Sequence, residues 1–164
     1  MKRFAFGLLL IFLAGNLFSQ KNVDNEKLKK IFEQNGDNAQ GNSMFPVIND
    51  ALPVIRYIED SLKAEIIKVE YDIVFSSKDT FRPLFKDWAY GIFIVGDYKI
   101  KGLGIKVYKQ VNNEWKLIKE NAENSNLALT MLTPDEDALY RFEIVAKNYV
   151  EPFTAGHFAL ILFH

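Results

Sequence analysis

The sequence contains no cysteine, and only two of its 164 residues are histidine. Without cysteine the chain can form no disulfide, no Cys-ligated zinc or iron–sulfur site, no thiol nucleophile and no lipid anchor on an N-terminal cysteine. The charges are nearly balanced, with 20 Lys and Arg against 21 Asp and Glu. A dedicated nucleic-acid-binding protein usually carries a clear basic excess, because it must displace the counterions around phosphates. We therefore expect no nucleic-acid partner.

The common catalytic motifs are missing as well. No G-x-S-x-G, H-E-x-x-H or P-loop pattern occurs, and neither His157 nor His164 belongs to a recognisable nucleophile or metal motif. In an alternating strand, His157 would share a side with Ala159, Ile161 and Phe163, which favours a core or edge position over a catalytic one. The sequence thus predicts neither an enzyme nor a cofactor.

Residues 1–19 have the pattern of an export signal. Lys2 and Arg3 precede a run of mainly apolar residues that is shorter than the about 20 residues a membrane-spanning helix needs, and polar residues follow at once. We predict cleavage after Ser19, with cleavage after Gly15 or a retained anchor as alternatives, and a location in the periplasm or outside the cell. Cleavage after Ser19 leaves 145 residues with 18 basic and 21 acidic side chains, a net charge of −3. No later run of 18 or more apolar residues occurs, so we expect no membrane embedding after cleavage.

A helical N-terminal segment is predicted over 20–63. Apolar residues at helical spacing predict a short helix near 24–34. The stretch NGDNAQGNS at 35–43 consists almost entirely of turn and linker residues, which predicts a flexible loop.

A second helix is predicted over 51–63. Asn49 or Asp50 is available as its N-cap, and Pro53 then falls in the first turn, where a missing N–H costs little. Whether this helical segment packs on the following domain is not apparent from the sequence.

Beyond residue 63 the hydrophobic period changes to two. In 65–75 apolar residues alternate with Lys68, Glu70 and Asp72, which predicts a strand with one solvent-exposed face. Further strands are predicted at 88–95, 100–110, 115–119, 126–132, 140–147 and 157–163, together with a short edge strand at 81–85. Seven or eight short strands without long helices between them predict a mainly β fold, an antiparallel, jelly-roll-like β-sandwich over 64–164.

Several strand and turn motifs follow one another between Trp88 and Phe163. They are WAYGIFIV before Gly96-Asp97, then IKGLGIKVYKQVNNEWKLI, NLALTMLTP, ALYRFEIVAKN and GHFALILF. In this order they resemble the bacterial pre-peptidase C-terminal domain, a secreted β-sandwich usually attached to proteases and other exported enzymes. The resemblance implies a sandwich fold and secretion. That family typically carries calcium-binding aspartates around the hairpin, but this chain has GLGIK at 102–106 and only Asp97 nearby, so the resemblance does not support a calcium site.

Asp97, Asp135 and Asp137 are the remaining weak candidates for metal ligands. The segment 133–136, Thr-Pro-Asp-Glu, fits a capping box and predicts one helical turn that would account for this acidic cluster. Because calcium needs roughly six to eight oxygen ligands, we expect no metal site.

Three aromatic residues are the candidates for ligand binding. A sugar ring could stack on Trp88, Tyr90 and Trp115, while Asn112 and Asn113 hydrogen-bond its hydroxyl groups. Trp115 follows the polar turn and is expected to be the most exposed of the three. Trp88 and Tyr90 alternate with isoleucines on one side of a strand, a pattern more typical of a core.

The sequence therefore predicts an exported, non-catalytic β-sandwich that binds a protein or a surface polysaccharide of the bacterial envelope. A glycan-binding module that uses exposed tryptophan and tyrosine is one alternative. An enzyme of an unrecognised class is the other, because a fold does not by itself define a function.

Overall fold

The computed structural model describes residues 44–164. The predicted export signal, the helix near 24–34 and the loop at 35–43 lie outside the described residues.

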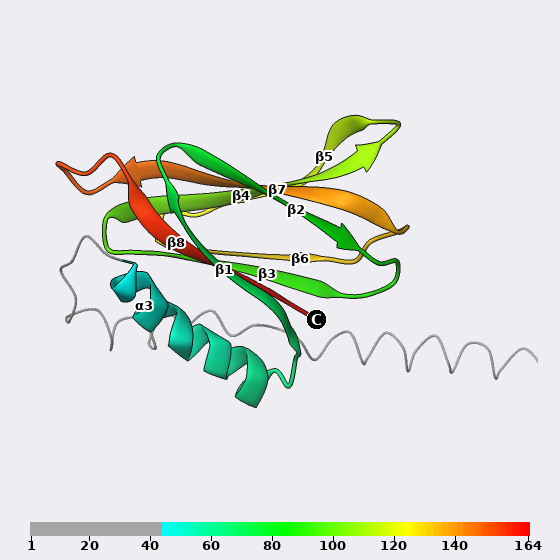
Figure 1. Cartoon of the computed structure of the whole chain (residues 1–164), viewed down its shortest axis with the longest axis horizontal. Helices are drawn as coiled ribbons and strands as arrows, with labels where there is room; N and C mark the ends of the chain where they lie inside the picture. The colour runs from blue at the N-terminus through cyan, green and yellow to red at the C-terminus, as the bar shows by residue number, and fades with distance from the viewer. Residues whose placement is uncertain (1–43) are drawn as a thin grey trace, which may run out of the picture.

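Two four-stranded antiparallel sheets form a sandwich (Figure 1). The strands are β1 (Ile66–Val74), β2 (Ser77–Leu84), β3 (Tyr90–Gly96), β4 (Ile100–Val111), β5 (Glu114–Ala122), β6 (Leu127–Leu132), β7 (Ala138–Tyr149) and β8 (Gly156–Phe163). One sheet has the order β1-β8-β3-β6 and the other β2-β7-β4-β5. This is the strand order of a jelly roll. Each strand is followed by a strand of the other sheet, except that β4 and β5 form a hairpin within one sheet. The predicted mainly β sandwich is confirmed, and every predicted strand is present with small shifts at its ends.

The main core lies between the sheets. Every second residue of the central strands points inward, and Ile92 of β3, Ile105 of β4 and Phe142 of β7 are completely buried there. This alternation follows from the period-two geometry of a strand, which sends successive side chains to opposite faces.

A second apolar core lies on the outer face of the β1-β8-β3-β6 sheet. Helix α3 (Phe45–Arg56), which continues as the π-helical turn η1 (Tyr57–Ser61), packs against that face (Figure 1). Val47 and Val54 of the helix are fully buried with Phe93 and Ile161 of the sheet. Strands β3 and β8 are consequently buried on both faces. Within residues 44–164 no helix is both long enough and apolar enough to cross a membrane.

The predicted start of this helix was wrong. It begins at Phe45, Met44 occupies the N-cap without a side-chain bond, and Pro53 lies inside the helix. The helix starts six residues earlier than predicted, because Val47 already packs on the sheet. Pro53 cannot donate to the carbonyl of Asn49, but Asn49 is exposed, so water can bind that carbonyl instead.

The orientation predicted for β1 was also wrong. Its charged residues do not form a solvent-exposed face: Glu70 and Asp72 lie on the same side as the buried Val74, toward β2 of the opposite sheet. Lys78 Nζ of β2 lies 2.7 Å from Asp72 Oδ2. Because β1 and β2 are the edges of different sheets, these charges bridge one open side of the sandwich.

The other open side is bridged by polar side chains of β5. Lys119 Nζ donates to the carbonyl oxygen of Met131 at 2.6 Å, and Asn121 Nδ2 donates to that of Leu129 at 2.6 Å. Both acceptors belong to β6, the edge of the facing sheet, so its outward carbonyl groups are occupied.

Candidate ligand-binding cleft

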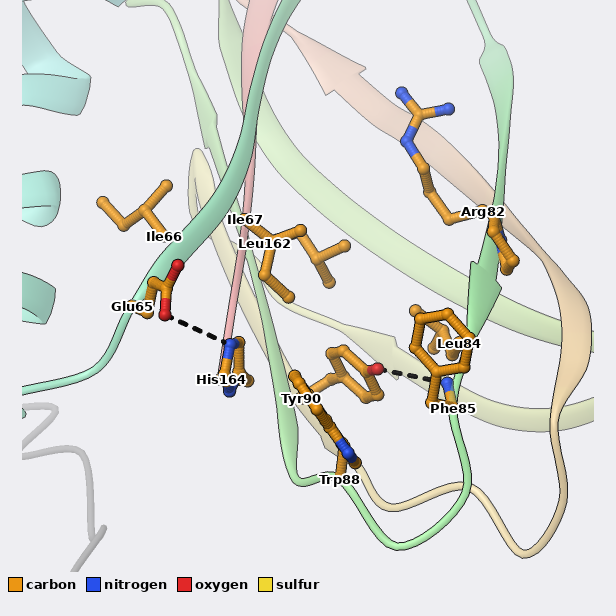
Figure 2. Close-up of a pocket in the computed structure, with 11 residues that line it drawn as sticks. Glu65, Ile66, Ile67, Arg82, Leu84, Phe85, Trp88, Tyr90, Leu162 and His164 are labelled. Carbon is orange, nitrogen blue, oxygen red and sulfur yellow. Dashed lines mark hydrogen bonds and ion pairs between the residues drawn. The ribbon is translucent and has the colours of Figure 1, made fainter.

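A cleft of about 530 Å³ opens between β1 and β2 at one end of the sandwich (Figure 2). Its lining comes from four parts of the chain. These are Glu65, Ile66 and Ile67 at the start of β1, Arg82, Pro83, Leu84 and Phe85 at the end of β2, Trp88 and Tyr90 at the start of β3, and Leu162 and His164 at the end of β8. The lining is mainly apolar and aromatic, with polar groups from Glu65, Arg82 and His164. Concave sites of this composition are the usual binding sites for small ligands.

Trp88 is the most prominent aromatic side chain of the cleft. The residue is 47% exposed although its ring lies beside three other rings. The ring centroids of Trp88 and His164 are 4.5 Å apart, and those of Trp88 and Tyr90 are 6.3 Å apart with the planes only 21° from parallel. Phe85 lies 6.2 Å away on the β2 side. The indole is therefore held in place while nearly half of its surface stays open to solvent.

Tyr90 positions the cleft wall. Its ring is 2% exposed and belongs to the core between the sheets. Its hydroxyl oxygen accepts a hydrogen bond from the backbone N–H of Phe85 at 3.1 Å (Figure 2). This bond ties the segment after β2 to the start of β3, and so fixes where the Phe85 ring stands relative to Trp88.

Glu65 and His164 form the opposite rim. Their backbones exchange two hydrogen bonds, with N···O distances of 2.8 and 3.0 Å. His164 Nε2 also lies 3.7 Å from Glu65 Oε2 (Figure 2). The pair offers hydrogen-bond acceptors and an imidazole beside the Trp88 indole.

The structure separates the aromatic residues that the sequence grouped together. Trp88 and Tyr90 line the cleft, but Trp115 lies on the outer face of the β2-β7-β4-β5 sheet, 5.5 Å from the Phe81 ring. Trp115 is less exposed than Trp88, contrary to expectation, because Phe81 and Arg141 pack against it.

Asn112 and Asn113 lie in the tight turn between β4 and β5, away from the cleft. Their φ angles are 50° and 66°. A two-residue hairpin turn of this type requires a left-handed backbone at both positions, and asparagine tolerates it better than most residues. Turn geometry accounts for this pair.

Asp97 and His157 form a buried pair at the other end of β3 and β8. Asp97 accepts hydrogen bonds from the backbone N–H groups of Lys99 and His157, both at 3.0 Å, and His157 Nδ1 lies 3.3 Å from the same carboxylate. No local pattern predicts Asp97 as the partner of His157, because the two residues are 60 positions apart. Burial raises the pKa of Asp50 on α3, and the negative charge of Asp97 raises it further.

The other acidic candidates bind cationic or backbone groups. Lys109 Nζ lies 2.6 Å from Asp135 and 2.7 Å from Glu136, and the side-chain hydrogen bond to Lys109 is the main cause of the lowered pKa of Asp135. Asp137 accepts a hydrogen bond from the backbone N–H of Lys86 at 2.7 Å. The helical turn predicted at 133–136 is absent, and the carboxylates of Asp135 and Glu136 pair with Lys109 of β4 across the fold. In the part of the chain that the structure describes, no group of three or more metal-binding side chains comes together.

Five residues of the cleft were not predicted from the sequence: Phe85, Ile67, Leu162, Glu65 and His164. They come from the two ends of the domain and from the segment after β2. A local pattern cannot reveal that the first and last strands pair side by side, which is what brings Glu65 to His164. The one available signal was the position of Phe85 and Trp88 on either side of a short polar turn.

No family model and no curated protein matches the sequence. Three solved structures have a similar architecture. A protein from Sulfurospirillum deleyianum is 9% identical with a TM-score of 0.42, and the match covers 58% of this chain and 96% of the other. The Yersinia pseudotuberculosis-derived mitogen is 12% identical with a TM-score of 0.39, and the match covers 60% of this chain and 85% of the other; a CBM4 structure is 10% identical with a TM-score of 0.38, and the match covers 66% and 83%. Similarity at this level carries no argument about function, and the resemblance to the pre-peptidase C-terminal domain stays a prediction.

Proposed function

We propose that this chain is a non-catalytic binding module that holds a sugar ring of a glycan against Trp88 in the cleft. The observation that carries the proposal is the half-exposed indole of Trp88, which His164 and Tyr90 hold at the wall of an open cleft. An ordered aromatic surface of this kind costs little conformational entropy when it binds a ligand.

The chemistry of the cleft suits an amphipathic ring. The C–H face of a pyranose can pack on the indole, while its hydroxyl groups reach Glu65 and His164 at the rim. The remaining walls, including Ile67 and Phe85, are apolar and exclude water from the stacked face.

One imidazole–carboxylate pair, His157 and Asp97, stands at the far ends of β8 and β3 from the cleft. Asp97 accepts hydrogen bonds from two backbone N–H groups, and His157 Nδ1 lies 3.3 Å from its carboxylate. The pair at the cleft is His164 and Glu65, whose Nε2 and Oε2 atoms lie 3.7 Å apart at the open rim, and we assign it to hydrogen bonding with the ligand. Export, proposed from the pattern of residues 1–19, would bring the module into contact with polysaccharides outside the cytoplasm.

A protein ligand is the second candidate function. It is favoured by the exposure of the Ile67 and Phe85 side chains at the cleft, because apolar and aromatic anchors are common at the centre of protein interfaces.

The test is calorimetric titration of the protein purified after expression of the full-length chain. The ligands are short oligosaccharides of the laminarin, xylan, chitin and mannan series. We expect at least one series to bind, and Trp88→Ala to abolish that binding. Phe75→Ala is the matched control, since Phe75 is also a well-exposed aromatic residue but lies in the β1–β2 turn at the opposite end of both strands.

Two results would overturn the glycan proposal. One is the absence of binding by all four series, and the other is a Trp88→Ala variant that binds like the wild type. An envelope protein captured through Trp88 and not displaced by any of these oligosaccharides would favour the protein candidate in its place.

A further inference from the structure

The aromatic surface of the cleft continues along β2 onto the outer face of its sheet. Phe81 and Pro83 point outward, opposite to the buried Leu84, and Phe85 follows them beyond the end of the strand. Phe85 contacts Trp88 at one end of this row, and Phe81 contacts Trp115 at the other, with ring centroids 6.2 and 5.5 Å apart. We call this row the aromatic track: Trp88, Phe85, Pro83, Phe81 and Trp115.

The track is exposed on an edge strand, where apolar residues are usually avoided. Phe81 is 43% and Phe85 is 53% exposed. Edge strands normally carry charges that discourage association, and contiguous exposed apolar surface marks interaction sites on soluble proteins. Leu139, which pairs with Pro83 in the neighbouring strand, is also exposed and widens the surface. Among the described residues the only long helix, α3, covers the other sheet.

Arg141 supports the far end of the track. Its guanidinium lies 4.0 Å from the centroid of the Tyr108 ring and 5.5 Å from that of Trp115, which fixes the tilt of the indole. Arg141 Nη1 lies 3.8 Å from Asp79 Oδ2, and the two side chains are 23% and 42% exposed. A donor and an acceptor for sugar hydroxyl groups therefore flank this end as they flank the cleft.

We infer that the ligand is a polymer, a glycan chain that leaves the Trp88 cleft, follows the aromatic track along β2 and stacks a second sugar ring at Trp115. The inference rests on the proposed function. Pro83 and Phe85 line the cleft and also belong to the track, so the two surfaces are continuous. Four residues of extended chain separate Phe81 from Phe85, a distance of about 13 Å, which is longer than a single sugar ring.

The test uses the oligosaccharide that binds the cleft, in a series of lengths from disaccharide to octasaccharide. Each is titrated calorimetrically into the protein expressed from the full-length chain. We expect the affinity to rise with chain length until a chain reaches both ends of the track. Trp115→Ala should weaken the binding of the long chains by between about twofold and tenfold, the range for loss of one stacked ring, and leave disaccharide binding unchanged. Trp115→Phe, which keeps a ring, should retain most of the gain with length.

The outcomes separate the two proposals. If the disaccharide binds through Trp88 but affinity does not rise with length, or if Trp115→Ala binds long chains like the wild type, the track is refuted and the cleft stands. If no oligosaccharide binds, or Trp88→Ala changes nothing, the proposed function fails and the inference fails with it. If Trp115→Ala does not fold, Phe81→Ala removes the neighbouring ring and is tested for the same weakening of long-chain binding. Phe75→Ala again serves as the control.

Discussion

Arg82 Nη2 of β2 lies 2.5 Å from Glu70 Oε2 of β1, and this ion pair joins the edge strands of the two sheets. The two side chains are 24% and 25% exposed, and the hydroxyl of Thr80 donates to the same Glu70 oxygen at 3.1 Å. Arg82 also lines the cleft, so the bridge lies directly beside the opening. The contact therefore links β1 to β2 at the side of the cleft.

Arg82→Met should lower the free energy of unfolding by about 1–3 kcal/mol, because Glu70 would keep its charge at a half-buried position without its main partner. The measurement is urea denaturation at neutral pH. The double variant Glu70→Gln/Arg82→Met should recover part of the loss. Lys68→Met removes a longer, more exposed contact to the same carboxylate, at 3.5 Å, and should cost less than about 1 kcal/mol. A double variant less stable than Arg82→Met would contradict this account.

Gly91→Ala should destabilise the packing between the sheet and α3. A Cβ at this position would lie 2.1 Å from Cζ of Phe163, the residue that faces Gly91 across β3 and β8. Phe163 is 1% exposed in the second core, so its ring has little room to move, and the cost should be about 1–3 kcal/mol. Denaturant unfolding gives the value.

The control for this prediction is Gly102→Ala. A Cβ there would approach no heavy atom closer than 3.3 Å, so the loss should be clearly smaller. Phe163→Leu in the Gly91→Ala background should restore part of the stability by opening space for the methyl group. An additive loss in that double variant would argue against the steric explanation.

The strands were predictable because alternation is a local property. From Leu103 to Val107 in β4 and from Tyr140 to Ala146 in β7, each core residue is two positions from the next, and that period is visible without any knowledge of pairing. The face of β1 was not predictable by the same rule. Glu70 and Asp72 alternate with apolar residues as in a solvent-exposed strand, but they meet Arg82 and Lys78 of another sheet.

The cleft was only partly predictable. Trp88 and Tyr90 stood out by residue type, but their isoleucine neighbours on the strand made a core position for both the better interpretation. Tyr90 is indeed buried, whereas Trp88 precedes β3 and escapes the alternation of the strand. The exposure of Trp115 was overestimated because Phe81 reaches it across the sheet from a strand 34 residues away in sequence.

Asp50→Asn should stabilise the protein at neutral pH. Burial, and secondarily the charge of Asp97, raises the pKa of Asp50 above its ordinary value of 3.8. A carboxyl group with a raised folded-state pKa favours folding while it is protonated. That contribution is complete below pH 3.8 and is lost as the pH rises through the folded-state pKa. At neutral pH the charged group therefore opposes folding, and the asparagine removes this cost.

Urea unfolding across a pH series measures the effect. The gain from Asp50→Asn should shrink as the pH falls toward 3.8, and it should also be smaller in an Asp97→Asn background, where the second cause is gone. Asp60→Asn, at an exposed position of the same helical stretch, controls for the loss of one negative charge. A less stable Asp50→Asn protein at neutral pH would show that the carboxylate makes a favourable contact that outweighs its burial.

Tyr149→Phe should remove part of the loss of stability in alkali. The Tyr149 hydroxyl donates to the carbonyl oxygens of Val74 and Phe75 at 2.9 and 2.8 Å, which ties the β1–β2 turn to β7. Burial, with a further contribution from the charge of Asp97, raises the pKa of Tyr149 from 10.0 to about 12. The stability due to this raised pKa is complete below pH 10 and disappears as the pH rises through about 12, because the phenolate can no longer donate.

The Tyr149→Phe variant should be about 1–2 kcal/mol less stable than the wild type at neutral pH, and this difference should narrow between pH 10 and 12. Urea unfolding of both proteins across that range gives the difference, and curves that stay parallel up to pH 12 would assign the alkaline loss to other tyrosines.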